Sequence, residues 1–333
     1  MITLAEVSCG ASRALIMLLL SGSLLFAVKP SASSVAAAGT ELERAFAFDQ
    51  GTPQQPRDAA AAAEAYRVAA DNGDLFAHVR LGYLYETGDG VPHDPAAARK
   101  HYEAAVAGGL TEGRLRLAIC YLEGWGGPVD RDAFAREVRV AAEAGYVPAQ
   151  RVLSSLYALG FAVPLNREES VRWLERAAQQ DDASAQVALG RNIEQARDIA
   201  LKADKTLART WYQLSAEQEY TEGMRAMAKT FLAGKKSDRN WVFGRRWLEL
   251  AADAADPEAP YILAVCEMLH VDSPEHDSER ARQWLRDAGC ARKFPCERGV
   301  RSRAIGKIAG RRHEARAVRS LRAKICAETP HES

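Results

Sequence analysis

The chain has 333 residues, of which 47% are hydrophobic, so it can bury a large apolar core. Its 44 lysines and arginines balance its 44 aspartates and glutamates, and the formal net charge at pH 7 is +0. This balance lacks the basic excess typical of proteins that bind nucleic acid, so we expect no nucleic-acid partner.

The first predicted element is an apolar segment near the amino terminus. Residues 14–28 carry no charge, and a charged residue flanks them on each side. The segment is shorter than the roughly 20 apolar residues that span a bilayer, and it fits the core of a signal peptide. Ala36 and Ala38 supply the small residues that a signal peptidase requires. We therefore expect a signal peptide over 1–38 and a periplasmic or secreted protein, the alternative being an uncleaved inner-membrane anchor.

A repeated pattern follows residues 39–57, which we interpret as a linker and a degenerate first helix. Over residues 58–292 the end of a second helix recurs, starting at Ala65, His101, Glu137, Trp173, Trp211, Trp247 and Trp284. Residues suited to open these helices, by accepting a hydrogen bond from free amides, are Asp94, Asp130, Asn166, Asp204, Asn240 and Asp277. The spacing of 36 to 38 residues predicts about seven helical hairpins stacked in one elongated body.

The first helix of each unit carries small residues at two fixed positions. They allow close approach of a second helix, because helix separation depends on the side chains at the contact. The positions hold Ala77, Gly113, Ala149, Ala185, Gly223, Ala259 and Cys296, and, five residues later, Gly82, Ala118, Ser154, Gly190, Ala228 and Ala264. The following loop contains Gly88 and Gly90, matched by Gly124 and Gly126. Glycine can adopt the left-handed conformation that ends a helix, so we expect these glycines to serve the turn and not a ligand.

This pattern resembles the Sel1-like repeat family, a relative of the tetratricopeptide repeats. The residues that carry the resemblance are Ala77, Leu81, Gly82, Tyr85, Gly88, Gly90, Val91, Asp94, Ala98, Tyr102, Ala105 and Gly109. The resemblance implies an all-α fold, a right-handed α/α superhelical solenoid of about seven helical hairpins. It also implies an adaptor, often in bacterial envelope assembly or signalling, and it brings no catalytic residues.

Enzyme motifs are absent from the sequence. It contains no phosphate-binding Gly-x-x-x-x-Gly-Lys-Ser/Thr, no His-Glu-x-x-His and no Gly-x-Ser-x-Gly string. His78, His93 and His101 fall within one unit, but no carboxylate or cysteine accompanies them at regular ligand spacing. We therefore expect no enzyme activity, no cofactor and no metal site.

Two cysteines near the end of the repeats are candidates for a disulfide. Cys290 ends the last recognised second helix and Cys296 opens the next helix, so the turn between them should bring the two within disulfide reach. Cys120 lies on an apolar helix face, where we expect an unpaired core residue.

The carboxyl-terminal segment, residues 293–333, is strongly basic. Between Glu297 and Lys324 it carries ten lysines and arginines against two glutamates. One interpretation is a set of capping helices with a polar outer face, as a solenoid end requires. The other is a surface for an anionic polysaccharide or a membrane.

Two hypotheses for the function follow. The first is a non-catalytic scaffold or adaptor in the bacterial cell envelope, in exopolysaccharide-related assembly or in periplasmic regulation of signalling. Its protein partner would lie on the concave surface, where the candidate contacts are Arg80, Tyr83, Arg116, Ile119, Arg151 and Arg191. The alternative is a protein that binds or hydrolyses cell-wall material or polysaccharide, although no isolated carboxylate pair stands outside the repeats.

Overall fold

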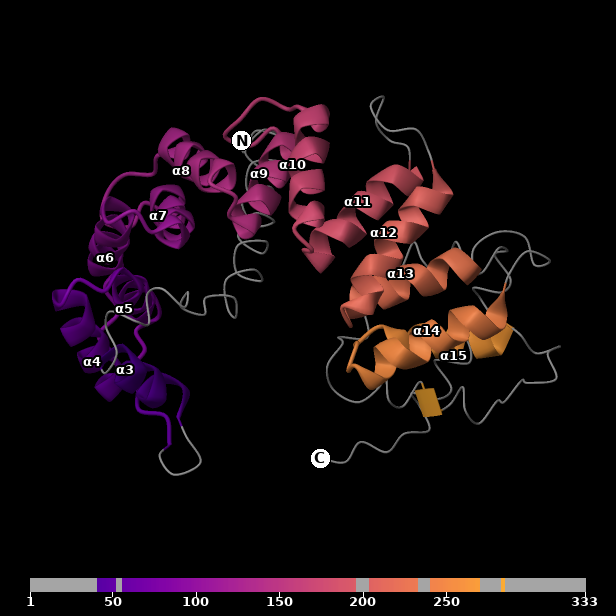
Figure 1. Cartoon of the computed structure of the whole chain (residues 1–333), viewed down its shortest axis with the longest axis horizontal. Helices are drawn as coiled ribbons and strands as arrows, with labels where there is room; N and C mark the ends of the chain where they lie inside the picture. Colours follow the sequence, from indigo (N-terminus) through magenta and orange to yellow (C-terminus); the bar gives the residue numbers. More distant parts are fainter. Residues whose placement is uncertain (1–40, 52–55, 196–203, 233–239, 270–282, 285–333) are drawn as a thin grey trace, which may run out of the picture. The chain divides into compact units, whose positions relative to one another are not determined.

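The computed structural model describes residues 41–51, 56–195, 204–232, 240–269 and 283–284 (Figure 1). Within these ranges the chain forms thirteen helices and no strands. This agrees with the predicted all-α solenoid. The expected signal peptide, the Cys290–Cys296 pair and the basic segment 293–333 lie outside the described residues.

Successive helices pack together as hairpins. The pairs are α3 (Glu41–Gln50) with α4 (Ala59–Asp71), α5 (Leu75–Thr87) with α6 (Pro95–Ala107), α7 (Thr111–Glu123) with α8 (Arg131–Glu143), α9 (Val147–Leu159) with α10 (Arg167–Gln179), α11 (Ala183–Gln195) with α12 (Lys205–Glu217), and α13 (Thr221–Leu232) with α14 (Trp241–Asp253). A further helix, α15 (Ala259–Leu269), packs on α14. The expected degenerate first helix is α3, which forms a hairpin with α4.

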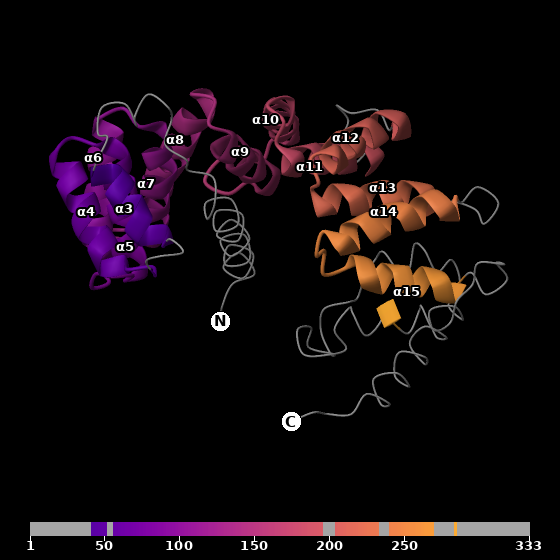
Figure 2. The ribbon, with the colours of Figure 1, turned by 60° about the horizontal axis from the view of Figure 1, so that its bottom comes forward.

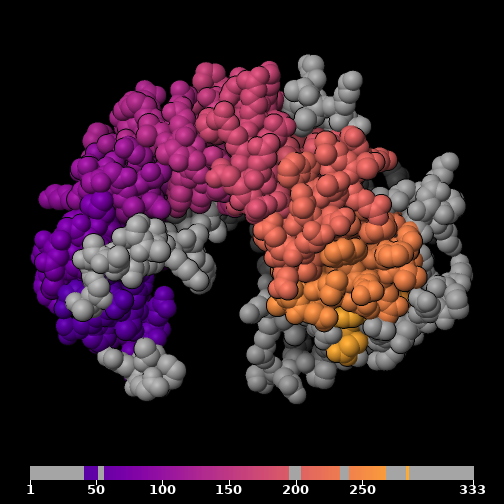
Figure 3. All heavy atoms as spheres, viewed as in Figure 1, coloured from indigo at the N-terminus to yellow at the C-terminus, as the bar shows by residue number. Residues whose placement is uncertain are grey.

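The hairpins fall into two compact units, which are described separately. Unit 1 ends at Gln180 and unit 2 begins at Asp181. In unit 1 the second helix of each hairpin also packs on the first helix of the next, so that α4 to α10 form a continuous stack. In unit 2 α12 packs on α13 and α14 on α15, and α13, α14 and α15 lie side by side (Figure 2). On the face seen in Figure 3 the atoms of neighbouring hairpins within each unit are in contact.

Local capping explains where the helices begin and end. Before the second helices, the side chains of Asp94, Asp130, Asn166, Asp204 and Asn240 accept hydrogen bonds from amides of the first turn. This confirms the predicted role of these residues. At the ends of α5, α7 and α9 a glycine adopts the left-handed conformation, as at Gly88 with φ of 72°. Its amide donates to the carbonyl oxygen of Leu84, which ends the helix.

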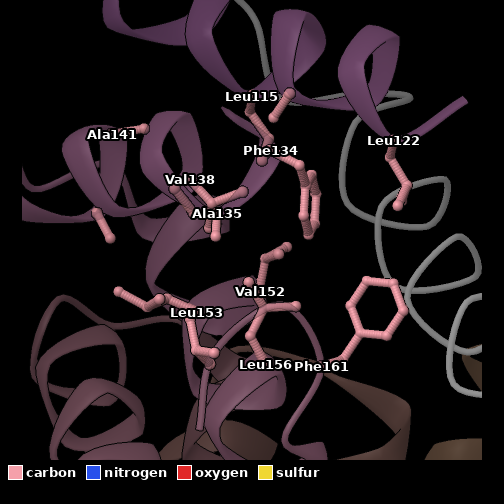
Figure 4. Packing of buried hydrophobic residues seen from close by; sticks show 14 of the residues in the cluster. Leu115, Leu122, Phe134, Ala135, Val138, Ala141, Val152, Leu153, Leu156 and Phe161 are labelled. Carbon is pink, nitrogen blue, oxygen red and sulfur yellow. The ribbon is translucent and has the colours of Figure 1, made fainter. Parts of the chain in front are cut away.

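The core of unit 1 is built from side chains that point between successive hairpins. In one cluster Leu115 of α7, Phe134 and Val138 of α8 and Val152 of α9 are all buried (Figure 4). Phe161, from the loop after α9, closes the cluster with its ring 6.3 Å from that of Phe134. The loop residue thus extends the apolar contact beyond the helices, and each hairpin depends on its neighbours for burial.

Two of the small residues on the first helices make room for a tyrosine. A Cβ atom on Gly82 would lie 2.6 Å from the ring of Tyr102, and one on Gly190 would lie 2.6 Å from the ring of Tyr212. Tyr102 and Tyr212 lie at equivalent positions of α6 and α12, and both are buried. At these two positions the missing side chain of glycine leaves the space that the tyrosine ring fills.

Candidate functional site

The predicted partner contacts all lie on the first helices of hairpins: Arg80 and Tyr83 on α5, Arg116 and Ile119 on α7, Arg151 on α9 and Arg191 on α11. In unit 1, α5 and α7 contact each other directly, which brings Tyr83 next to Arg116. We call the accessible side of α5, α7 and α9 the first-helix surface of unit 1. It bears four of the predicted residues, each partly accessible, namely Arg80, Tyr83, Arg116 and Arg151.

The prediction for Ile119 is wrong. Its side chain is only 4% exposed and belongs to the same core cluster as Phe134 and Val152. The physical reason is its position on the helix, four residues after Leu115 and three before Leu122, which puts all three on one face. Because that face packs into the core, Ile119 is not available to a partner.

Arg80 is held by a buried carboxylate from the preceding hairpin. It forms an ion pair with Asp49 of α3, whose side chain is 6% exposed. Tyr66 donates its hydroxyl hydrogen bond to Asp49 at 3.0 Å, and Arg57 Nε donates to the Asp49 carbonyl oxygen at 2.8 Å. Burial raises the pKa of Tyr66, which keeps its hydroxyl a donor. These contacts offset the cost of removing the Asp49 carboxylate from water.

Tyr83 lies between two guanidinium groups. The guanidinium carbon of Arg80 is 5.5 Å from the centre of the Tyr83 ring, and that of Arg116 is 5.0 Å from it. Arg116 in turn lies 3.4 Å from the carboxylate of Glu86, which also accepts a hydrogen bond of 2.6 Å from the Tyr102 hydroxyl. Burial raises the pKa of Tyr102 well above its ordinary value. The Tyr83 ring is thus fixed by charged groups that are themselves paired.

Unit 2 has a similar network with the pairing in the opposite direction along the chain. Arg191 of α11 pairs with Glu222 of α13 at 2.7 Å, and Arg225 pairs with Asp256 at 3.0 Å and with Glu258. Burial favours a higher pKa for Glu222, but Arg191 outweighs it and the pKa is lowered. Each arginine therefore joins its first helix to the next hairpin.

The acidic partners of these arginines were missed by sequence reasoning. Asp49, Glu86 and Glu222 lie 31, 30 and 31 residues from the arginines they pair with. That interval is somewhat shorter than one repeat, so a search for opposite charges at this separation could have found them. These arginines therefore join neighbouring hairpins through ion pairs, and they are also accessible on the surface.

A family model described as "Sel1 repeat" matches residues 75–110, 111–136, 147–182, 183–220, 221–256 and 257–291. These matches cover more than half of the chain. The chain belongs to the Sel1 repeat family. The hairpin of α3 and α4 precedes the first matched repeat, yet it supplies Asp49 to the network of unit 1.

Two solved structures resemble the chain in fold. One is a Sel1 repeat protein from Oxalobacter formigenes, with a TM-score of 0.60, 22% identity, and coverage of 80% of this chain and 100% of that one. The other is a protective antigen of uropathogenic Escherichia coli with an SLR fold, with a TM-score of 0.58, 24% identity and coverage of 84% of this chain. The chain spans 61% of the length of that antigen. A search of curated proteins found no match.

Sel1 repeat proteins are generally scaffolds for protein–protein interaction. The described ranges contain no group of three or more His, Cys, Asp or Glu side chains placed to hold a metal ion. None of the helices described is long and apolar enough to cross a membrane. Cys120 is a free, buried thiol, as predicted, and burial raises its pKa to about 12.

Two histidines of the second hairpin do meet. The Nδ1 atoms of His78 on α5 and His101 on α6 lie 3.1 Å apart, and the Tyr85 ring stacks on His101 with centroids 5.5 Å apart. Burial lowers the pKa of both imidazoles. The pair is thus a contact between neutral rings that joins the two helices of one Sel1 repeat.

Proposed function

We propose that the chain is a non-catalytic scaffold of the bacterial cell envelope and that a protein partner binds the first-helix surface of unit 1. The observation that carries the proposal is the Tyr83 ring held between Arg80 and Arg116 on a Sel1 repeat solenoid. Tyrosine and arginine are the side chains that contribute most often to binding energy at protein interfaces. Since the ion pairs already orient these side chains, little conformational entropy remains to be lost on binding.

The envelope assignment is supported by the amino-terminal sequence. The uncharged segment 14–28 and the Ala36/Ala38 pair match a signal peptide that directs export. Sequencing the amino terminus of the protein purified from cells tests this step. A mature chain that starts at Gly39 supports it, whereas an intact Met1 in the membrane fraction would favour an uncleaved anchor.

Crosslinking in intact cells tests the binding surface. A photoreactive benzoylphenylalanine replaces Tyr83, and a control chain carries it in place of Arg136, an exposed residue on the second helix α8. We expect a protein crosslink from position 83 and a different pattern, or none, from position 136. Identical products from both positions, or no product from position 83, would contradict the proposed surface.

The identity of the captured molecule distinguishes the pathways. Capture of a component of exopolysaccharide assembly or of a periplasmic signalling system would place the scaffold there. Recovery of glycan in place of protein would favour the alternative of a polysaccharide-binding protein. The basic segment 293–333 can be tested separately, by comparing binding of the chain with and without it to anionic vesicles and to an acidic polysaccharide.

A further inference from the structure

The facing histidines of the second hairpin carry chemistry that a protein-binding scaffold does not need. His78 lies near the start of α5 and His101 in the middle of α6, and their Nδ1 atoms are 3.1 Å apart. Both residues are partly exposed, so solvent reaches the pair. The helices α4, α5 and α6 and the loops between them are described throughout.

The separation of the two nitrogens fits a shared metal ion. Imidazole nitrogens bind Zn²⁺ at about 2.0 to 2.1 Å. Two nitrogens at that distance, with an angle at the ion between about 90° and 109°, lie about 2.8 to 3.4 Å apart. The observed 3.1 Å falls within this interval. An ion can therefore bind both Nδ1 atoms without moving the two helices apart.

The two rings are also in the form that binds metals. A histidine must be neutral to offer a nitrogen lone pair to a metal ion. Burial lowers the pKa of both imidazoles, and the neighbouring His78 lowers that of His101 further. Between neutral rings, one Nδ1–H group donates to the other Nδ1 atom. When an ion binds, this ring changes tautomer and carries its hydrogen on Nε2, so both Nδ1 lone pairs face the ion.

Two neighbours favour a cation at this place. The Tyr85 ring stacks on His101 with an angle of 9° between the planes, which limits rotation of the imidazole. Against the effect of burial, the carboxylate of Asp71 at the end of α4 acts to raise the pKa of both His78 and His101. A negative charge that favours a proton on these rings also favours a divalent cation between them.

The next hairpin shows what usually connects these two repeat positions. There they hold Arg114 and Glu137, which form an ion pair of 2.9 Å between α7 and α8. The corresponding residues of the later hairpins are Gln150 with Trp173, Gln186 with Trp211 and Met224 with Trp247. Of these five hairpins, only the second has an imidazole at both positions. A metal ion would supply the positive charge that an arginine supplies in the next hairpin.

We propose that His78 and His101 form a binding site for a divalent transition-metal ion of the kind that imidazole prefers, such as Zn²⁺ or Ni²⁺. Within the described ranges no third His, Cys, Asp or Glu is placed to complete the site, so water takes the remaining positions. The ion links α5 to α6 and exchanges with solvent. This proposal departs from the sequence-based expectation of no metal site, because only the structure shows the 3.1 Å contact.

Calorimetric titration of the purified full chain with Ni²⁺ tests the proposal. Mg²⁺ is the control ion, because it prefers oxygen ligands. We expect saturable binding of Ni²⁺ and none of Mg²⁺. No binding of Ni²⁺, or equal binding of the two ions, would overturn the proposal.

Single substitutions locate the ion. His78→Asn and His101→Asn each remove one of the two ligands, so each should weaken Ni²⁺ binding by at least about tenfold. His93→Asn, at an exposed histidine in the loop of the same hairpin, is the matched control and should leave binding unchanged. Binding elsewhere in the chain would survive both ligand substitutions. Unchanged binding by a folded His78→Asn or His101→Asn variant, or its loss in His93→Asn, therefore contradicts the site.

A double variant separates metal binding from the stability of the hairpin. His78→Arg with His101→Glu reproduces the ion pair of Arg114 and Glu137, so this variant should fold and yet lose Ni²⁺ binding. Circular dichroism confirms the folding of each variant.

Urea denaturation measures whether the ion links the two helices. An ion bound only by the folded chain raises the folding equilibrium constant about elevenfold at a concentration ten times its dissociation constant. We expect the denaturation midpoint of the chain to rise with Ni²⁺, and that of the double variant to change less. An equal rise in both, or Ni²⁺ binding retained by the double variant, would overturn the assignment to His78 and His101.

Discussion

Units 1 and 2 use the same repeat but satisfy their charged side chains differently. In unit 1 Arg80 of α5 pairs backward with Asp49 of α3, and glycine-rich loops pack on the starts of the neighbouring second helices. In unit 2 Arg191 and Arg225 pair forward, with Glu222 of α13 and with Asp256 and Glu258 before α15. One repeat pattern therefore carries ion pairs that run in opposite directions along the chain in the two units.

The largest expected effect comes from the buried anion of unit 1. Asp49→Ala should destabilise the fold by about 3 kcal/mol, because it leaves Arg80 and the Tyr66 hydroxyl without their acceptor. In unit 2, Glu222→Ala should cost about 1 kcal/mol, since the Arg191–Glu222 pair is more exposed. Urea denaturation of the purified chain measures both, with Glu64→Ala at an exposed ion pair as a neutral control. If Asp49→Ala and Glu222→Ala lower the free energy of unfolding equally, the contrast between the two units is wrong.

The second effect concerns the glycine beneath a tyrosine. Gly82→Ala should destabilise the chain by about 2 kcal/mol, because the new Cβ atom would lie 2.6 Å from the Tyr102 ring. In a Tyr102→Leu background the same substitution should cost far less, and the equivalent Gly190→Ala with Tyr212→Leu should behave alike in unit 2. The double-mutant cycle measures the coupling directly. Additive costs would show that the tyrosine is not the reason for the glycine.

The loop glycines should differ from each other. Both Gly88 and Gly90 have positive φ, so an alanine at either should cost about 1 kcal/mol. Gly90→Ala should cost more than Gly88→Ala, because its Cβ atom would meet the backbone of Ala59 at 2.2 Å. Partner binding by either variant should follow its stability, as measured by denaturant midpoint and crosslinking yield. A stable Gly90→Ala variant that has lost binding would show that the loop is a ligand site.

The smallest expected effect is a pH dependence confined to the second hairpin. Burial lowers the folded-state pKa of both His78 and His101, and the neighbouring His78 lowers that of His101 further. Asp71 acts in the opposite direction on both imidazoles, and Asp74 does so on His78. The unfolded chain therefore binds protons on these imidazoles at a higher pH than the folded chain does. The free energy of unfolding is highest above pH 6.5, and it falls as the pH decreases from that value through the folded-state pKa values. The loss should stay below about 1 kcal/mol, since both imidazoles are partly exposed. Denaturation at pH 7.5 and pH 5 compares the chain with His101→Asn, which should reduce the difference.

Much of the fold could be predicted because its signals are local. Asp94 and Asn166 open helices through hydrogen bonds to amides two or three residues away, and Gly88 ends one through its own left-handed conformation. The candidate surface was predicted less well. Tyr83 and Arg116 do come together, but Ile119 is buried, because the core face of α7 is wider than the stripe of small residues that revealed it.

The sequence by itself determined the helical hairpins, their period and their caps, since capping and turn geometry act over a few residues and repeat at every unit. It also determined membership of the Sel1 repeat family. Only the tertiary structure decided that Arg80 pairs with Asp49 and that Tyr102 requires Gly82. These outcomes depend on contacts between residues 20 to 35 positions apart, where neighbouring helices compete for the same space and the same charges. Such competition is settled by packing in three dimensions.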